Sequence, residues 1–173
     1  MKTLGSILFI AVFTNVLNAQ TINTKTLEQR IATIEDKMAI KNVADVFSNL
    51  ADTKEIDKQV LLFTKDGKVE SGSGEQKMIL SGRKQLFDAF SAYLSNFEIV
   101  YHQNGQQTID ELSENTAKTT SYCRVILVGK QNEKEVKTTL YVIYNDEFVK
   151  ENGIWLIKHR FSNFVRQEVE EVK

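Results

Sequence analysis

Hydrophobic residues in the first third of the chain recur at helical spacing. Apolar positions follow one another at intervals of three and four from residue 27 to 38, and again from 40 to 50 in a slightly shifted phase; this is the period of an amphipathic helix. Thr26 and Gln29 stand at the spacing of a capping box, in which each side chain binds the backbone amide of the other residue. We therefore predict one long helix after Thr26, or two helices joined near residues 35–36.

Two shorter helices are predicted farther along the chain. Thr53 is expected to cap a short helix, and Ser81 a longer one whose apolar side chains run from Leu86 to Leu94. Between these helices, Lys65–Gly67 is predicted to form a turn that leads into two short strands within residues 68–80.

After Asn96 the pattern changes to strict alternation, which is typical of β-strands with one buried face. Asn152-Gly153 is a pair favoured in tight hairpins. Strands longer than ten residues favour a strongly twisted, curved sheet. Four extended segments are predicted, at residues 97–109, 117–129, 135–149 and 153–165.

This order of elements predicts an α+β fold: a conical barrel with three N-terminal helices packed on a strongly curved, mainly antiparallel sheet. Such a sheet does not close on itself, so the helices plug its concave side and leave an apolar cavity that suits a small apolar molecule. We expect one domain over residues 20–165 and a frayed, charged tail at 166–173.

The N-terminus has the layout of a secretory signal peptide. A basic start precedes an apolar run, and the small residue Ala19 stands before Gln20. The run is too short to span a bilayer comfortably. Residues 1–19 are therefore predicted to be removed by cleavage near Ala19-Gln20, which leaves an exported protein, periplasmic or extracellular, without a membrane-inserted segment.

Composition excludes several classes of protein. The formal net charge of −1 gives no basic surface for nucleic acid. The single cysteine, Cys123, excludes internal disulfides and multi-cysteine zinc sites. With two histidines and no phosphate-binding glycine loop, the sequence predicts no metal site and no cofactor.

Several local strings, in their order and spacing, resemble the SnoaL-like (polyketide cyclase-like) branch of the nuclear transport factor 2-like superfamily. The resemblance covers about residues 27–165 and implies the conical fold described above. The family includes dehydratases, isomerases and cyclases as well as members without a demonstrated reaction, so fold alone does not settle function. The strings are residues 38–52, Leu62–Gly67 (LFTKDG), Ser81–Lys84 (SGRK), and Tyr144–Phe148 (YNDEF) with Gly153–Ile157 (GIWLI).

The resemblance implies that Asp52 and His102 face the cone as a catalytic pair. Asp52 follows the long helix, although Asp57 is close enough to take its place, and Asp52 also suits a helix cap. Alternation does not decide whether His102 points inward, because both faces of its strand carry apolar residues. Histidine suits acid–base work, since its ordinary pKa of ~6.5 lies near neutral pH.

Further polar residues are candidates for lining the cavity. Tyr144 is expected to bind a substrate oxygen. Asp146, on the same strand face, is a substrate-binding candidate or an ion-pair partner of Arg160 or Arg124. Tyr122 and Tyr101 are weaker substrate-binding candidates, and His159 is expected to pack among aromatic residues rather than act in catalysis.

One departure from the dehydratase pattern concerns a second pocket histidine. Scytalone dehydratase-like enzymes carry it on the strand that corresponds to residues 117–129, and this chain has none there.

Three hypotheses for the function follow: a cofactor-free lyase or isomerase in which His102 and Asp52 transfer protons, a non-catalytic ligand-binding module, and a homodimeric interaction protein. An Asp52–His102 distance within hydrogen-bond reach favours the first.

Overall fold

The architecture comes from a computed structural model that describes residues 25–72 and 77–172. The predicted signal peptide, residues 1–19, lies outside the described residues. No helix in the described ranges is long and apolar enough to span a bilayer. The elements are α1 (Leu27–Asp52), α2 (Ile56–Gln59), the 3₁₀ turn η1 (Val60–Leu62), β1 (Phe63–Ser71), β2 (Met78–Ser81), α3 (Arg83–Leu94), β3 (Ile99–Leu112), β4 (Thr116–Gln131), β5 (Lys134–Glu151) and β6 (Ile154–Glu171).

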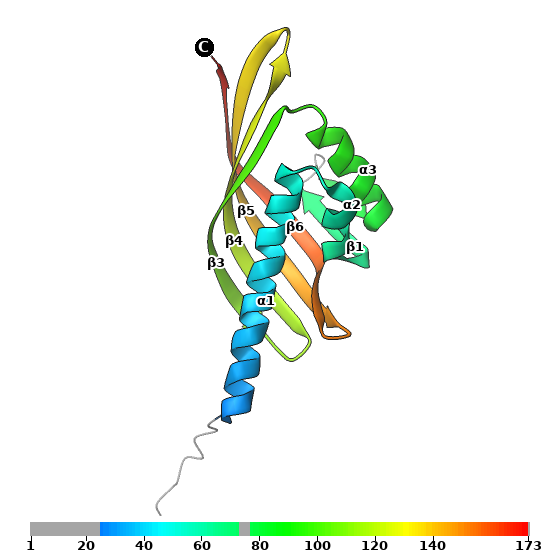
Figure 1. Ribbon diagram of the computed structural model, residues 1–173, viewed down its shortest axis with the longest axis vertical. Helices are drawn as coiled ribbons and strands as arrows, with labels where there is room; N and C mark the ends of the chain where they lie inside the picture. Colours follow the sequence, from blue (N-terminus) through cyan, green and yellow to red (C-terminus); the bar gives the residue numbers. More distant parts are fainter. Residues whose placement is uncertain (1–24, 73–76, 173) are drawn as a thin grey trace, which may run out of the picture.

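Helix α1 is one continuous helix of 26 residues. Its capping box is formed, because Thr26 Oγ1 accepts a hydrogen bond from the Gln29 amide at 3.2 Å and Gln29 Oε1 accepts one from the Thr26 amide at 2.9 Å. The predicted start of the helix is therefore confirmed. The first turns extend beyond the sheet (Figure 1), and the face that begins at Ile40 is buried. Only the C-terminal half of α1 therefore contributes to the interior.

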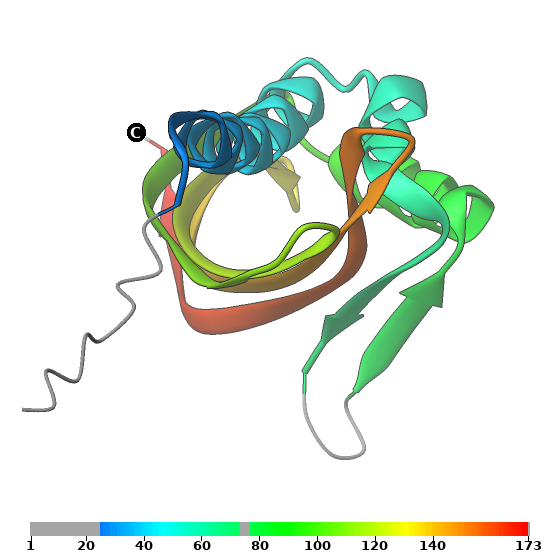
Figure 2. The same ribbon diagram turned by 90° about the horizontal axis from the view of Figure 1, so that it is seen from below.

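The strands form one six-stranded sheet in the order β2-β1-β6-β5-β4-β3. All neighbours pair antiparallel except β1 and β6, which run parallel. Seen from below, the long strands curl around α1 without closing into a complete barrel (Figure 2). The predicted α+β fold, with three helices on a curved and mainly antiparallel sheet, is confirmed.

A bulge in β6 decides which of its side chains face the helices. Ile157 and His159 oppose neighbouring residues of β5, so Lys158 between them is an extra residue. An extra residue reverses the inside–outside alternation for the residues that follow. Ile157 and Arg160 are therefore both buried, whereas His159 is partly exposed.

The C-terminal segment is a strand rather than a frayed tail. Residues 166–171 continue β6 and pair with residues 136–141 of β5. The prediction for these residues was wrong because main-chain pairing with a long neighbouring strand requires no apolar sequence. Cross-strand contacts add support, since Lys134 binds Glu171 at 2.8 Å and Tyr141 donates a hydrogen bond to Glu168 at 3.1 Å.

Three local predictions are corrected by backbone geometry. Residues 65–67 lie inside β1 rather than in a turn, and a Cβ at Gly67 would come within 2.8 Å of the Phe63 Cβ. Gly82, with φ of +80°, takes the N-cap position of α3 in place of Ser81. Thr53 ends α1 and does not cap α2.

An aromatic cluster fixes the helices against the sheet. Phe47 of α1 contacts Phe63 of β1 edge-to-face at 6.0 Å between ring centroids, and Phe90 of α3 at 6.1 Å. Such pairs contribute about 0.5–1.5 kcal/mol beyond the area they bury. Because Phe47 and Phe90 also line the interior cavity, the same packing that holds the helices shapes the candidate site.

Candidate active site

A cavity of about 490 Å³ lies between the helices and the concave face of the sheet. This volume falls within the range of small-molecule sites, roughly 300–1,000 Å³. Most of the lining side chains are apolar, and the wall as a whole comes from the three α-helices and all six strands. Among the polar lining residues, Gln59, His102, Tyr144 and Arg160 are the ones that bear on chemistry.

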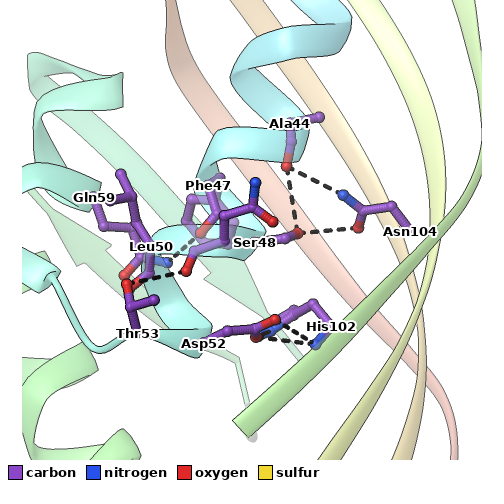
Figure 3. Close-up of polar contacts among 10 residues, drawn as sticks. Ala44, Phe47, Ser48, Leu50, Asp52, Thr53, Gln59, His102 and Asn104 are labelled. Atoms are coloured by element: carbon purple, nitrogen blue, oxygen red, sulfur yellow. Dashed lines mark hydrogen bonds and ion pairs between the residues drawn. The ribbon is translucent and has the colours of Figure 1, made fainter.

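The structure brings Asp52 and His102 together at the cavity. Asp52 Oδ1 lies 2.6 Å from His102 Nδ1, and both carboxylate oxygens accept the His102 backbone N–H, at 3.0 and 3.1 Å (Figure 3). The Asp52 side chain is 22% exposed and that of His102 is 7% exposed. Asp57 is exposed on α2 and takes no part in the pair.

Local folding explains why these two residues meet. Asp52 is the last residue of α1, and His102 lies near the start of β3, which crosses the C-terminal half of the helix. The backbone hydrogen bonds fix the carboxylate, and the carboxylate in turn fixes the imidazole ring. With Nδ1 committed to Asp52, the nitrogen left for a ligand is Nε2, which is the arrangement that a general base requires.

A second polar pair, Asp146 and Arg160, is more completely buried than the first. Arg160 donates to both carboxylate oxygens of Asp146 at 2.7 Å, and the side chains are 2% and 0% exposed. The guanidinium is stacked between two rings, 4.1 Å from the centroid of Phe47 and 4.4 Å from that of Tyr144. Burial disfavours its charged form, but the Asp146 carboxylate outweighs burial and raises the pKa of Arg160.

One nitrogen of the Arg160 guanidinium has no hydrogen-bond partner among the described residues. This atom, Nη1, is buried. The same residue borders both the large cavity and a hole of about 10 Å³ between α1 and the sheet, which is room for about one water molecule. The guanidinium, whose charge Asp146 balances, thus places a hydrogen-bond donor at the cavity wall.

Tyr144 lies against Arg160 and lines the cavity. Burial raises the pKa of Tyr144 well above its ordinary value, so the phenol stays protonated at neutral pH. A protonated hydroxyl beside a guanidinium suits hydrogen bonding to a ligand oxygen. Asp146 forms the ion pair with Arg160 and does not line the cavity. Of the two roles expected from the sequence, it therefore has that of an arginine partner and not that of a substrate-binding residue.

Three other predicted or weighed residues lie outside this cavity. Tyr101 and Tyr122 are 53% and 44% exposed and are absent from the cavity wall. His159 lies 3.4 Å from Glu70 and is also outside the cavity. Tyr101 points away from the cavity because neighbouring residues of a strand face opposite sides of the sheet, and His102 faces inward.

Sequence reasoning missed Arg160 as a cavity residue and did not consider Gln59. Arg160 appeared only as a possible partner of Asp146, because plain alternation along β6 places it opposite Trp155 and Ile157. Arg160 faces the interior because the extra residue at Lys158 reverses the alternation of β6. The sequence signal that could have found Arg160 was Asp146, because a carboxylate that is expected to be buried needs a buried cation beside it. In the described ranges, no group of three or more histidine, cysteine, aspartate or glutamate residues has the geometry to hold a metal ion.

Comparison with known proteins adds the family. The model of the SnoaL-like domain matches residues 32–161. No curated protein sequence matches the chain significantly.

Solved structures share the fold at low sequence identity. A candidate scytalone dehydratase from Novosphingobium aromaticivorans is 22% identical, with a TM-score of 0.72 over 83% of this chain and 93% of its own. The protein Kfla4162 from Kribbella flavida is 14% identical, with a TM-score of 0.71 over 79% and 95%. The hexachlorocyclohexane dehydrochlorinase LinA-type3 from Novosphingobium barchaimii is 12% identical, with a TM-score of 0.67 over 82% and 94%.

The match to the family model spans most of the described chain. The alignments with the similar structures extend over nearly the whole length of those proteins. The chain therefore belongs to the SnoaL-like domain family of the nuclear transport factor 2-like superfamily.

Proposed function

We propose that this protein binds a small, mainly apolar molecule in the cone and catalyses cofactor-free proton transfer on it, as a lyase or isomerase. The observation that carries the proposal is the 2.6 Å contact between Asp52 and His102 at the wall of an apolar cavity. Two proteins of similar fold bear the names of a dehydratase and a dehydrochlorinase. Both names denote eliminations, in which a base removes a proton and a leaving group departs.

In this mechanism His102 is the general base. Its Nε2 takes a proton from a ligand carbon, while Nδ1–H stays hydrogen-bonded to the Asp52 carboxylate, which stabilises the imidazolium that forms. The electron pair of the broken C–H bond then forms a double bond. In an elimination the leaving group departs from the neighbouring carbon with its bonding electrons. In an isomerisation the π electrons of a neighbouring carbonyl move onto its oxygen.

Arg160 and Tyr144 are placed to stabilise the negative charge that develops. Arg160 Nη1 has no acceptor among the described residues, and the Tyr144 hydroxyl is protonated. Donors held in place by packing need no reorganisation when charge appears on an oxygen, and such donors account for much of enzymatic rate enhancement. His102 then returns its proton to the leaving group or to a second carbon, so the residues end as they began.

Export and dimerisation belong to the proposal as well. The signal-like residues 1–19 support function outside the cytoplasm, and N-terminal sequencing of the exported protein tests the cleavage after Ala19. The outer face of the sheet exposes Tyr101 and Tyr122, which supports pairing with a second copy. Sizing chromatography with light scattering tests this pairing.

Hydrogen exchange on a ketone tests the proposed chemistry without knowledge of the natural substrate. The probe is 2-tetralone in D₂O, whose carbon-bound protons next to the carbonyl are replaced by deuterium when a base removes them. Proton NMR measures the rate with wild-type protein, His102→Ala and Asp52→Asn. His159→Ala is the matched control, because this histidine lies outside the cavity.

We expect the wild type and His159→Ala to accelerate the exchange equally. His102→Ala should lose about 100-fold or more, which is the usual contribution of a general base, and Asp52→Asn should lose less because the imidazole remains. Equal rates for wild type and His102→Ala would refute the assigned base. Binding of 2-tetralone without any exchange would favour the non-catalytic binding module.

A further inference from the structure

Buried polar atoms without partners mark places where a ligand can complete the structure. Among the described residues, three buried side-chain atoms have no hydrogen-bond partner: Gln59 Oε1, Thr119 Oγ1 and Arg160 Nη1. Leaving such an atom unpaired costs about 1–3 kcal/mol, so native proteins contain few of them without a reason. Gln59 and Arg160 line the same cavity, and Thr119 does not.

Arg160 Nη1 already has a partner in the proposed function, the oxygen of the ligand, and in the unliganded protein a water can serve it. Arg160 also borders the water-sized hole, whose wall includes the polar side chains of Ser48 and Ser121. Gln59 borders only the large cavity, with its mainly apolar wall. A buried water needs two to four polar partners, and an apolar wall supplies too few of them. The Gln59 oxygen is therefore the atom that calls for a ligand.

The orientation of the Gln59 amide is fixed by one hydrogen bond. Its Nε2 donates to the backbone oxygen of Phe47 at 3.0 Å (Figure 3), and the residue is 1% exposed. This bond identifies the nitrogen and leaves Oε1 as a free acceptor. Gln59 lies in the cavity wall, and its terminal torsion is soft, so a small rotation that keeps the bond to Phe47 presents the oxygen to a ligand.

We propose that Gln59 is a specificity residue that accepts a hydrogen bond from a hydroxyl group of the ligand. The ligand class is then a mainly apolar compound that carries a carbonyl or equivalent oxygen at the Tyr144–Arg160 side and a hydroxyl at Gln59. The inference rests on the proposed function for the location of the ligand, but the selection of a hydroxyl is a property of binding and does not require turnover.

The probes are 2-tetralone and its ring-hydroxylated isomers at positions 5, 6, 7 and 8, with the four methoxy compounds as controls. A methoxy group keeps the oxygen and removes the donated hydrogen. Isothermal titration calorimetry gives the dissociation constant of each compound for wild type and for Gln59→Met, which keeps the length of the side chain and removes its amide. Gln167→Met is the matched control, because Gln167 also lines the cavity but is exposed.

For wild type we expect at least one hydroxy isomer to bind about 5- to 100-fold more tightly than 2-tetralone, the ratio that corresponds to filling one buried acceptor. Its methoxy counterpart should lose this gain. Gln59→Met should bind 2-tetralone as wild type does and show no preference for the hydroxyl, whereas Gln167→Met should keep the preference. A preference that survives in Gln59→Met, or no hydroxyl preference in wild type, overturns the inference.

Two measurements guard against misreading the result. The melting temperature of unliganded Gln59→Met should stay within a few degrees of wild type, because the variant also removes an unpaired buried acceptor. A fall of about 10 °C or more would show that the amide is structural and would overturn the inference. The two proposals fail separately. If wild type and His102→Ala catalyse deuterium exchange on 2-tetralone at equal rates but both keep the preference for the hydroxy compound, the proposed chemistry is refuted and the role of Gln59 in binding stands.

Discussion

The buried pair of Asp146 and Arg160 offers the sharpest quantitative test of the fold. Both side chains are almost fully buried and share two hydrogen bonds of 2.7 Å. Asp146→Leu leaves the guanidinium in the interior without its counter-ion. Removing one partner of a buried ion pair costs about 3–5 kcal/mol, because the remaining charge has lost its solvation and gained nothing in return.

The double variant separates the cost of an orphaned charge from the value of the pair itself. Asp146→Leu combined with Arg160→Met replaces both charged groups by apolar ones of comparable size. Such replacements are often neutral or stabilising, so we expect the double variant to recover most of the stability lost in Asp146→Leu. Some loss should remain, because Arg160 also stacks on Phe47 and Tyr144.

Urea unfolding followed by circular dichroism measures these differences, with the slope checked for constancy among variants. For a domain of this size, 3–5 kcal/mol corresponds to a fall in melting temperature of about 6–20 °C. Lys84 and Asp88 form an exposed ion pair at 2.7 Å, so Asp88→Ala is the control and should change stability by less than about 0.5 kcal/mol. A loss below about 1 kcal/mol in Asp146→Leu, or a double variant as unstable as Asp146→Leu, would refute the reasoning.

Three further predictions concern other parts of the molecule. Burial raises the pKa of Cys123 to about 11, so iodoacetamide at pH 8 should leave the folded protein unmodified and label it in urea; rapid labelling without denaturant would contradict this burial. An alanine Cβ at Gly129 would lie 2.5 Å from the backbone oxygen of Asn96, so Gly129→Ala should lower the free energy of unfolding by about 1–3 kcal/mol, whereas Gly105→Ala, whose nearest contact is 3.4 Å, should lose clearly less. Burial opposes ionisation of Asp36, but hydrogen bonds from Lys150 and Trp155 outweigh burial and lower the pKa of Asp36. The stabilisation that these bonds provide is complete above the unfolded pKa of ~3.9 and is lost as pH falls through the lower folded pKa. The stability difference between wild type and Asp36→Asn should therefore shrink between about pH 5 and pH 2, and a constant difference would count against the assigned contacts.

The chain order of helices and strands was readable from the sequence because it depends on local periodicity. The capping box at Thr26 and Gln29 fixed the start of α1, and strict alternation after Asn96 marked the long strands. The pairing of Asp52 with His102 came from family resemblance rather than from pattern, since both faces of β3 carry apolar residues near His102. The segment 166–171 was misjudged because strand pairing there depends on the neighbouring strand rather than on its own composition.

Tertiary structure alone decided that Arg160 and Gln59 line the cone. One extra residue, Lys158, reverses the alternation of β6 and brings Arg160 inside in place of His159. Gln59 reaches the cavity because a short helix follows α1 and turns back to the Phe47 carbonyl. Sequence periodicity records the average spacing of apolar residues, whereas a bulge or a returning helix is a single local event whose energy comes from contacts with distant parts of the chain. The sequence by itself therefore determined the elements and their order, and the packing of those elements determined the site.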